Sequence, residues 1–230
     1  MLLDRDDADM TIRRYAERYG QYGYSPKTLG WDKGKQDVRF HILTDGFDCR
    51  GKSMLDIGCG FGDLNLTLRA RCGQEYSYLG VDLVDTLLAE GRQRYENERV
   101  HFTAGNFLEL PLAGNFDIGL ASGVFNHRLA HSDSYTVIEA TMAKAFGICR
   151  EGIAFDFLSD KVDYQHEHTF HSSPERILAM AYHLSRNVVL RNDYMPFEFA
   201  VYVFKDDGFD KSDTLFRRYK NIMSKGGQTA

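Results

Sequence analysis

The segment from Met54 to Leu64 constrains this 230-residue chain more than any other part of the sequence. It reads Met-Leu-Asp-Ile-Gly-Cys-Gly-Phe-Gly-Asp-Leu, a short apolar strand that runs into a turn with glycine at positions 58, 60 and 62. Glycine lets the backbone turn sharply and approach a ligand closely, because it has no Cβ. Asp56 comes near the carboxyl end of the strand, where α/β folds place their ligands. The segment therefore predicts a cradle for a nucleotide-type cofactor.

A second apolar run places an acid where the ribose of a nucleoside would lie. Residues 78–81 predict a short strand, and Asp82 follows it, 20 residues after Gly62. In dinucleotide-binding folds an acid at about this distance accepts hydrogen bonds from the ribose hydroxyls. A dinucleotide fingerprint, however, requires its third glycine at position 63, where this chain has Asp63. The spacing thus favours a different nucleoside cofactor.

The pattern Asp-x-Gly-x-Gly-x-Gly resembles the first motif of the class I S-adenosylmethionine-dependent methyltransferases. Two later strand ends strengthen the resemblance, because 100–103 leads into Gly-Asn-Phe and 116–121 leads into Ser-Gly-Val. By resemblance, the first of these lies against adenine and the second beside the sulfonium and the methyl acceptor. The resemblance implies cofactor contacts from Asp56, Gly58, Cys59, Gly60, Asp82, Leu83, Asn106, Phe107 and Ser122. Asn106 has an alternative role, since its amide also suits the capping of a turn.

The order of apolar runs and helical segments predicts one α/β domain over residues 1–230. We expect a Rossmann-like, doubly wound sheet of seven strands, mostly parallel with an antiparallel C-terminal strand, and an N-terminal helical cap over residues 1–45. The expected strands are 54–57, 78–81, 100–103, 116–121, 152–158, 188–194 and 199–205. The expected helices are 11–19, 35–43, 62–71, 84–97, 133–148 and 174–185. Residues 159–173 form a connection long enough to wall an acceptor pocket.

The cap carries three further candidates for cofactor binding. Residues 22–40 resemble the N-terminal cap of a bacterial subgroup of small-molecule methyltransferases, which implies cofactor contacts from Trp31, Gln36 and Arg39. Gln36 and Arg39 share one helix face at i and i+3, and a guanidinium suits a carboxylate bidentately. Their alternative role is to anchor the helix through ion pairs. Trp31, the one tryptophan of the chain, suits either a packing anchor for the cap or a ring that stacks on a ligand.

Three histidines are the candidate catalytic residues. His127 and His131 follow the fourth strand, and His168 lies in the long connection. A methyl acceptor needs a base only if it is protonated at rest, and histidine titrates in the useful range. His127 is the first choice, because it lies nearest the expected sulfonium. The string His166-Glu-His-x-x-His171 also suits a metal, but it lacks the helical His-Glu-x-x-His arrangement, and we predict no metal.

The overall composition restricts the partners. A net charge of −5 and a pI near 5.9 argue against a polyanion such as nucleic acid, and the basic residues between 211 and 225 predict a solvated tail helix. Four cysteines without paired spacing indicate reduced thiols, and the acidic N-terminus does not resemble a signal peptide. We therefore expect a cytoplasmic protein with no membrane partner, present as a monomer or homodimer.

The predicted activity is methyl transfer from S-adenosylmethionine to an oxygen or nitrogen of a small-molecule metabolite, with S-adenosylhomocysteine as the product. One alternative is a methyltransferase that modifies RNA or protein, which would need a basic or peptide-binding groove. Another is a non-methylating nucleoside-binding protein or an aminopropyl transferase on the same fold. The resemblance disfavours the aminopropyl transferase, because Ser122-Gly123-Val124 stands where polyamine enzymes carry paired acids.

Overall fold

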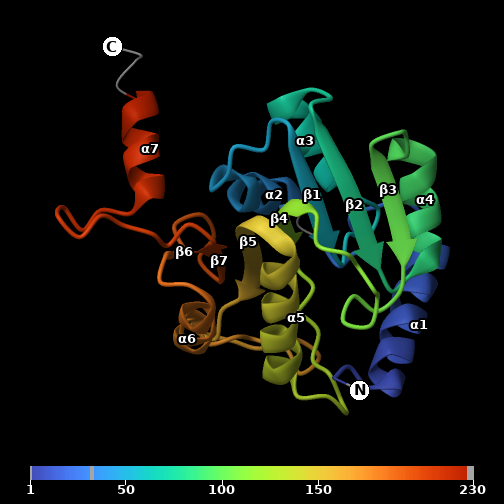
Figure 1. Ribbon diagram of the computed structural model, residues 1–230. Coiled ribbons are helices and arrows are strands. Elements are labelled where there is room, and N and C mark those ends of the chain that lie inside the picture. Colours follow the sequence, from blue (N-terminus) through green and yellow to red (C-terminus); the bar gives the residue numbers. More distant parts are fainter. Residues whose placement is uncertain (1, 32–33, 227–230) are drawn as a thin grey trace.

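The computed structural model describes residues 2–31 and 34–226 and shows a seven-stranded sheet covered by helices (Figure 1). The strand order is β3-β2-β1-β4-β5-β7-β6; the first five strands run parallel, and β7 is antiparallel to both β5 and β6. The bounds are β1 Lys52–Ile57, β2 Tyr76–Asp82, β3 Val100–Ala104, β4 Phe116–Ala121, β5 Cys149–Leu158, β6 Val188–Arg191 and β7 Glu198–Phe204. The predicted fold class is confirmed.

Seven helices are present in the described part of the chain. They are α1 Arg5–Tyr22, α2 Gln36–Asp45, α3 Leu64–Cys72, α4 Asp85–Tyr95, α5 Ser134–Ile148, α6 Pro174–Leu184 and α7 Arg217–Gly226. Figure 1 shows α1 beyond the carboxyl ends of β2 and β3, whereas α7 projects away from the sheet. The basic tail was expected to be a solvated helix, and α7 is one: its described side chains are largely exposed.

Each face of the sheet has its own apolar core, because side chains alternate along a strand. Met54 of β1 packs with Leu68 of α3 and Tyr202 of β7 on one face. Leu55, the next residue of β1, belongs to the core of the opposite face with Ile138 of α5. The near-complete burial of β1 and β7 follows from helices on both sides.

Several boundaries differ from the predicted ones. Helix α1 begins at Arg5, because the Asp4 side chain accepts a hydrogen bond from the backbone N of Asp6 and caps the first turn, and Gly20 lies inside the helix rather than ending it. The last two strands pair antiparallel at the edge of the sheet, where β7 lies between β5 and β6 and β6 is the outermost strand. The connection through α6 places β6 one strand position away from β5. The short turn after β6 then lets β7 occupy the position between them as an antiparallel strand.

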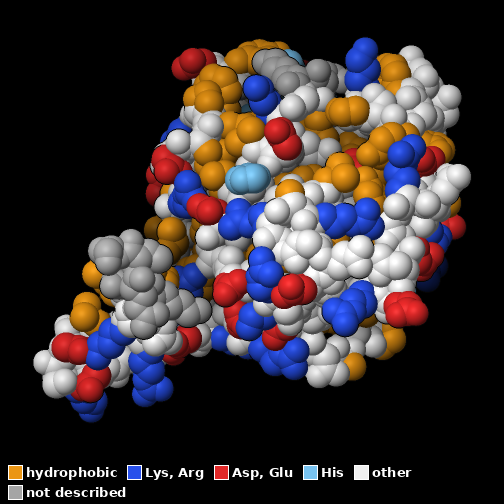
Figure 2. Space-filling view, turned by 90° about the horizontal axis from the view of Figure 1, so that it is seen from above, with side chains coloured by type: hydrophobic (Ala, Val, Ile, Leu, Met, Phe, Trp, Pro, Cys, Tyr) orange, Lys and Arg blue, Asp and Glu red, His pale blue; other side chains and the backbone are white. Residues whose placement is uncertain are grey.

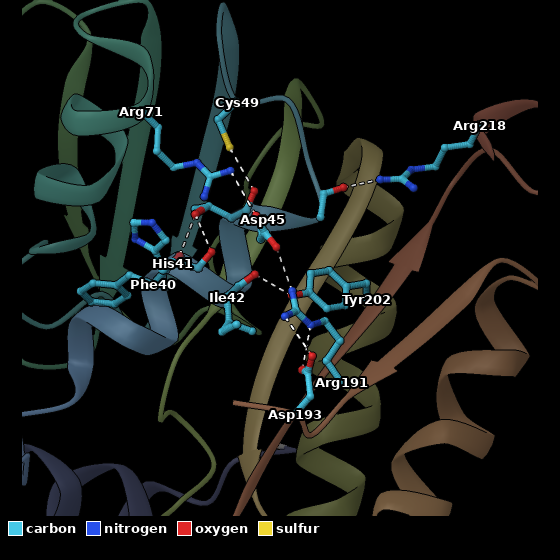
Figure 3. A network of polar contacts seen from close by, with 12 residues as sticks. Phe40, His41, Ile42, Asp45, Cys49, Arg71, Arg191, Asp193, Tyr202 and Arg218 are labelled. Carbon is cyan, nitrogen blue, oxygen red and sulfur yellow. Dashed lines mark hydrogen bonds and ion pairs between the residues drawn. The ribbon is translucent and has the colours of Figure 1, made fainter. Parts of the chain in front are cut away.

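Helix α2 is fixed at its C-terminal end by cationic side chains from distant elements (Figure 3). Asp45 lies between Arg71 of α3, at 3.6 Å, and Arg191 of β6, at 2.9 Å. The hydroxyl of Tyr202 donates to the Ile42 carbonyl, and Arg218 of α7 donates to the Gly46 carbonyl. Cations near the end of a helix also interact favourably with its dipole. The network orients α2 so that its other end lies at the cavity described below.

The face at the amino-terminal ends of the strands carries intermixed acidic and basic side chains, and α7 extends from it (Figure 2). No helix in the described part of the chain combines the length and apolar character that a bilayer-spanning helix requires.

Candidate cofactor and acceptor site

One cavity lies at the carboxyl ends of β1, β2 and β4 and extends beneath the N-terminal cap. It is lined by residues from four segments of the sheet and by residues of the cap. The predicted cofactor residues that line it are Trp31, Gln36, Asp56, Gly58, Cys59, Gly60, Asp82, Leu83, Asn106, Phe107 and Ser122. Arg39 is absent from the lining, and so are His131 and His168, whereas His127 is part of it. The structure thus brings most of the predicted residues together, and their roles remain predictions.

The glycine loop has the backbone geometry that its sequence predicts. Gly58, Gly60 and Gly62 all have positive φ, at 66°, 55° and 77°. A Cβ on Gly58 would lie 2.5 Å from a methyl group of Val124, which belongs to the loop after β4. Since an L-residue is strained at such φ values and would meet this neighbour, the close contact between the loops requires glycine.

Asp82 both shapes the loop and faces the cavity. Its carboxylate accepts hydrogen bonds from the backbone N of Gly60, at 2.8 Å, and from that of Val84, at 2.9 Å. Burial raises the pKa of Asp82, and the backbone donors counteract this effect. Each oxygen accepts one backbone hydrogen bond and keeps a second acceptor position, which leaves capacity for the two hydroxyls of a ribose.

Asp56 is buried and supports the floor of the cavity. Its carboxyl accepts a hydrogen bond of 2.7 Å from the Tyr78 hydroxyl, and burial raises the pKa of Asp56 to about 7. Burial also raises the pKa of the neighbouring Cys59 thiol, which leaves it protonated and unreactive. Asn106 lines the cavity, but its side-chain oxygen caps a turn by accepting from the Leu108 backbone N at 3.1 Å. Its side-chain NH₂ group keeps its donors for a ligand.

The cap supplies cavity residues that sequence reasoning missed. Thr11 and Tyr15 of α1 line the cavity together with Leu29. Tyr15 lies close enough to Asp82 for that carboxylate to raise its pKa, although burial is the larger cause. The sequence marks 4–28 only as a polar, partly helical segment, and nothing in its pattern indicates which side of α1 faces the sheet.

A buried carboxylate holds α1 in this position. Asp7, only 2% exposed, accepts hydrogen bonds from the backbone N of Ala130, at 2.7 Å, and Ser132, at 2.7 Å. It also accepts from the backbone N of His131, at 3.2 Å. Hydrogen bonds from Ser132 and the neighbouring amides lower the pKa of Asp7 more than desolvation raises it. The loop after β4 is therefore tied to the first helix of the cap.

The surroundings of His127 determine which of its ring nitrogens carries the hydrogen. Arg14 of α1 lies with Nη1 3.3 Å from Nδ1 of His127. A guanidinium only donates, so Nδ1 is the acceptor and the neutral ring carries its hydrogen on Nε2. Desolvation by burial lowers the pKa of His127, and the charge of Arg14 lowers it further. The ring is thus neutral near pH 7 and offers a hydrogen-bond donor, whereas its basic nitrogen is already occupied.

The other predicted histidines lie outside the cavity. His131 and His168 have exposed side chains, and His168 contributes its backbone carbonyl to the Arg128 N at 3.1 Å. Nδ1 of His171 lies 2.7 Å from the Ser159 carbonyl, so this ring fixes the connection between β5 and α6. No cluster of three metal-ligating side chains occurs in the described ranges 2–31 and 34–226.

Arg39 has partners that its predicted role did not include. Its Nε donates to Glu198 Oε2 at 2.6 Å, and its Nη2 pairs with the other carboxylate oxygen. The guanidinium carbon lies 3.9 Å from the centre of the Trp31 ring. The alternative role of an ion-paired anchor is thus present in the structure, with a buried rather than an exposed pair.

Comparisons with known proteins agree with this geometry. A family model described as a methyltransferase domain matches residues 54–152. Magnesium protoporphyrin IX methyltransferase from Synechocystis PCC 6803, solved with bound SAH, has a TM-score of 0.59 at 13% identity, over 86% of this chain and 95% of that one. The pyocyanin biosynthetic protein PhzM has a TM-score of 0.58 at 15% identity, over 83% of this chain and 61% of its own.

Sequence relatives match over shorter stretches. A protein named "Probable fatty acid methyltransferase" from Pseudomonas putida is 31% identical over 128 residues, which is 53% of this chain and 30% of the relative. A demethylmenaquinone methyltransferase from Shouchella clausii is 34% identical over 68 residues, 28% of this chain and 29% of its own length. The matches thus span less than a third of these two relatives. Residues 54–152 thus match a methyltransferase domain, in agreement with the resemblance of the glycine loop, and the structural neighbours share the fold.

Proposed function

We propose that this protein transfers a methyl group from S-adenosylmethionine to an oxygen or nitrogen atom of a small-molecule acceptor. The observation that carries the proposal is a cavity shared by the glycine loop, Asp82 and Asn106 with the cap residues Trp31 and Tyr15. This cavity suits an adenosine with a polar tail. The glycine loop allows a ligand to approach the backbone closely, a carboxylate can bind the two ribose hydroxyls, and an amide beside an apolar wall can bind the base.

The residues present fit this cofactor at each end. At the nucleoside end, Asp82 keeps two acceptor positions, and Leu83 and Phe107 provide apolar surface for a base. At the other end, Gln36 and Ser122 line the cavity next to the loop of Gly58. When bound, S-adenosylmethionine supplies a sulfonium whose methyl carbon is electrophilic.

The contribution of the chain is then mainly to position the acceptor and exclude water. Direct displacement at carbon requires a nucleophile aligned about 3 to 3.5 Å from the methyl group. Asp156 of β5 fixes the loop beside the reacting atoms, because it accepts hydrogen bonds of 2.6 Å from Ser122 Oγ and from Gly123 N. His127 donates from Nε2 in its neutral form, which suits an acceptor oxygen that it orients rather than deprotonates.

The activities named for similar proteins support a small acceptor. They refer to a fatty acid, to demethylmenaquinone and to magnesium protoporphyrin IX. Each name applies to the similar protein itself. For this chain we infer from them only that the acceptor is a small molecule.

Isothermal titration calorimetry with S-adenosylhomocysteine tests the cofactor assignment. We expect saturable 1:1 binding, and we expect Asp82→Ala to weaken it about 100-fold, because two hydrogen bonds to a carboxylate are lost at about 1.5 to 3 kcal/mol each, partly offset by water. Asp85→Ala is the matched control, since this exposed acid of α4 pairs with Arg92 and does not line the cavity. Denaturant unfolding of both variants separates lost contacts from loop disruption, because Asp82 also holds Gly60.

A wild-type protein that does not bind S-adenosylhomocysteine would refute the proposal. If binding is found, tritium transfer from methyl-labelled S-adenosylmethionine to defined phenols, carboxylic acids and amines identifies the accepting atom. Transfer to oligonucleotides or peptides, with none to the small molecules, would replace the small-molecule assignment with the RNA or protein alternative.

A further inference from the structure

No described residue of α7 lines the cavity discussed above. The helix extends from the body of the protein at the amino-terminal ends of the strands (Figure 1, Figure 2), whereas the cavity lies at their carboxyl ends. Arg218 attaches the helix to the body. It donates to the Gly46 carbonyl, and its guanidinium carbon lies 3.7 Å from the centre of the Phe204 ring. This attachment leaves other sides of the helix exposed.

Three apolar side chains share one exposed side of α7. Tyr219, Ile222 and Met223 lie at positions i, i+3 and i+4, which are neighbours on the surface of a helix. They are 52%, 50% and 61% exposed, and Leu215, two residues before the helix, is exposed as well. Single apolar residues are common on protein surfaces, but a group on one helix face marks a surface that binds an apolar partner. We refer to Tyr219, Ile222 and Met223 as the apolar face of α7.

The charged residues of α7 are all basic. They are Arg217, Arg218, Lys220 and Lys225, and residues 217–230 contain no acid. At about 3.6 residues per turn, each position is rotated by about 100° from the one before, so positions 218 and 220 lie on either side of the apolar face. Lys220 pairs with Asp213, but both side chains are partly exposed, and such a surface pair is weak. The apolar face is therefore flanked by cations that can interact with an external anion.

An anionic phospholipid bilayer matches both features of α7. The apolar side chains of an interfacial helix enter the boundary between headgroups and acyl chains, and flanking lysine and arginine side chains reach the lipid phosphates. A second copy of α7 would bury the apolar face, but it would bring basic flanks together with no acid on either helix to pair with them. A nucleic acid would pair with the cations but leave the apolar face in water.

We propose that α7 binds the surface of an anionic phospholipid bilayer, with Tyr219, Ile222 and Met223 inserted below the headgroups. The inference goes beyond the proposed function and does not depend on it. Ten residues of helix span about 15 Å, about half the thickness of the hydrocarbon core, so α7 lies in the bilayer surface rather than across it.

The charge around α7 sets the expected strength of binding. The whole chain has a net charge of −5, but exposed charges more than about 8 Å apart are largely screened at physiological salt. Residues 205–226 contain six basic and four acidic residues. Two of these acids already have cationic partners, since Asp207 pairs with Arg186 and Asp213 with Lys220. The local charge is thus positive but small, and binding should require both the apolar face and the anionic lipid.

Flotation of the full chain with phospholipid vesicles tests the proposal. Vesicles of phosphatidylcholine alone are compared with vesicles that also contain phosphatidylglycerol, at low and at high NaCl. We expect the wild type to bind the phosphatidylglycerol vesicles about 10-fold more tightly at low NaCl, and to lose this preference at high NaCl because salt screens the attraction. The double variant Tyr219→Gln with Met223→Gln should bind them about 10-fold more weakly, because apolar surface is lost while helix propensity is kept.

A second double variant provides the matched control. Leu66→Gln with Tyr182→Gln replaces two side chains that are each 55% exposed, on α3 and α6, and it should bind vesicles as the wild type does. Both double variants should keep the wild-type unfolding free energy, because all four side chains are exposed. Neither pair lines the cavity, so S-adenosylhomocysteine affinity should be the same in all three proteins. Vesicle binding and cofactor binding can therefore fail independently.

Several results would overturn the proposal. The wild type may not float with anionic vesicles is the first of them to check, and equal binding to the two kinds of vesicle is the second. Equal vesicle binding by the two double variants would show that the apolar face of α7 takes no part. Sedimentation without vesicles tests the remaining occupant: a wild-type dimer that only the Tyr219→Gln, Met223→Gln variant dissociates, with no vesicle binding, would show that a second copy covers this face.

Discussion

Replacing Gly123 with alanine should displace Trp31 from its position between the cavity and Arg39. Gly123 has a φ of 70°, and a Cβ there would lie 2.6 Å from Trp31 Cη2, well inside van der Waals contact. Neither neighbour moves freely, because Asp156 holds the Gly123 backbone N and Arg39 stacks on the Trp31 ring. The substitution therefore adds a steric conflict to a strained backbone.

Gly73→Ala provides the reference for the backbone component. Gly73 follows α3 with a φ of 62°, but a Cβ there would have no neighbour within 4 Å. Strain at positive φ costs about 1 to 2 kcal/mol, and overpacking a filled site costs about 1 to 3 kcal/mol. Gly73→Ala should thus lose about 1 to 2 kcal/mol of unfolding free energy, and Gly123→Ala about 2 to 5 kcal/mol.

Denaturant unfolding and tryptophan emission together measure both effects. In Gly123→Ala we expect a changed emission maximum in the folded protein, because the ring leaves the guanidinium. Gly73→Ala should keep the wild-type spectrum. The packing account is refuted if the two variants lose the same free energy and both retain the wild-type emission.

Three further predictions concern charged groups. Asp7→Asn should lower the unfolding free energy at pH 7 by about 2 kcal/mol, because a carboxylate with several backbone donors is lost. The folded pKa of Asp7 is lowered, so the stabilisation by its carboxylate is present above the ordinary pKa near 3.9 and disappears as the pH falls through the folded pKa. An equally large difference between variant and wild type at pH 2 would contradict the prediction. For Asp56 the folded pKa is raised to about 7, so its stabilising contribution is complete below about pH 4 and is lost as the pH rises towards 7. The unfolding free energy of Asp56→Asn, measured by urea titration, should therefore rise by about 2 to 4 kcal/mol relative to wild type between pH 4 and 8. A difference between variant and wild type that does not change with pH would count against the prediction. Nitrogen NMR should show the His127 ring neutral at pH 7, with its hydrogen on Nε2. Arg14→Ala should raise the pKa of His127, because a nearby positive charge is removed. A positively charged His127 ring in the wild type at pH 7 would contradict the neutral Nε2–H form that we assign.

The local patterns determined the cradle and the order of the sheet. An apolar strand leads into Gly58, Gly60 and Gly62, and the next strand ends at Asp82. Both features are predictable from the sequence, because a turn depends on its own residues and parallel neighbouring strands end at the same edge of the sheet. The three glycines have positive φ in the structure, and Asp82 lines the cavity and accepts a hydrogen bond from Gly60 N; its contact with a ribose stays a prediction. The boundaries differ at several elements: the Asp4 cap moves the start of α1 to Arg5, and β1, β2 and β5 each begin two or three residues before the predicted start.

Only the tertiary structure decided which side chains complete the site. Arg39 binds Glu198 across 159 positions of the sequence, and Asp7 binds the backbone at 130–132. The sequence shows that these residues are charged, but a charge has no partner until the fold brings an opposite charge or a row of amides within about 3 Å. The same holds for His127, whose contact with the Arg14 guanidinium joins residues 113 positions apart in the sequence. Burial and long-range pairing set protonation and orientation, and both arise only when α1 and α2 close over the sheet.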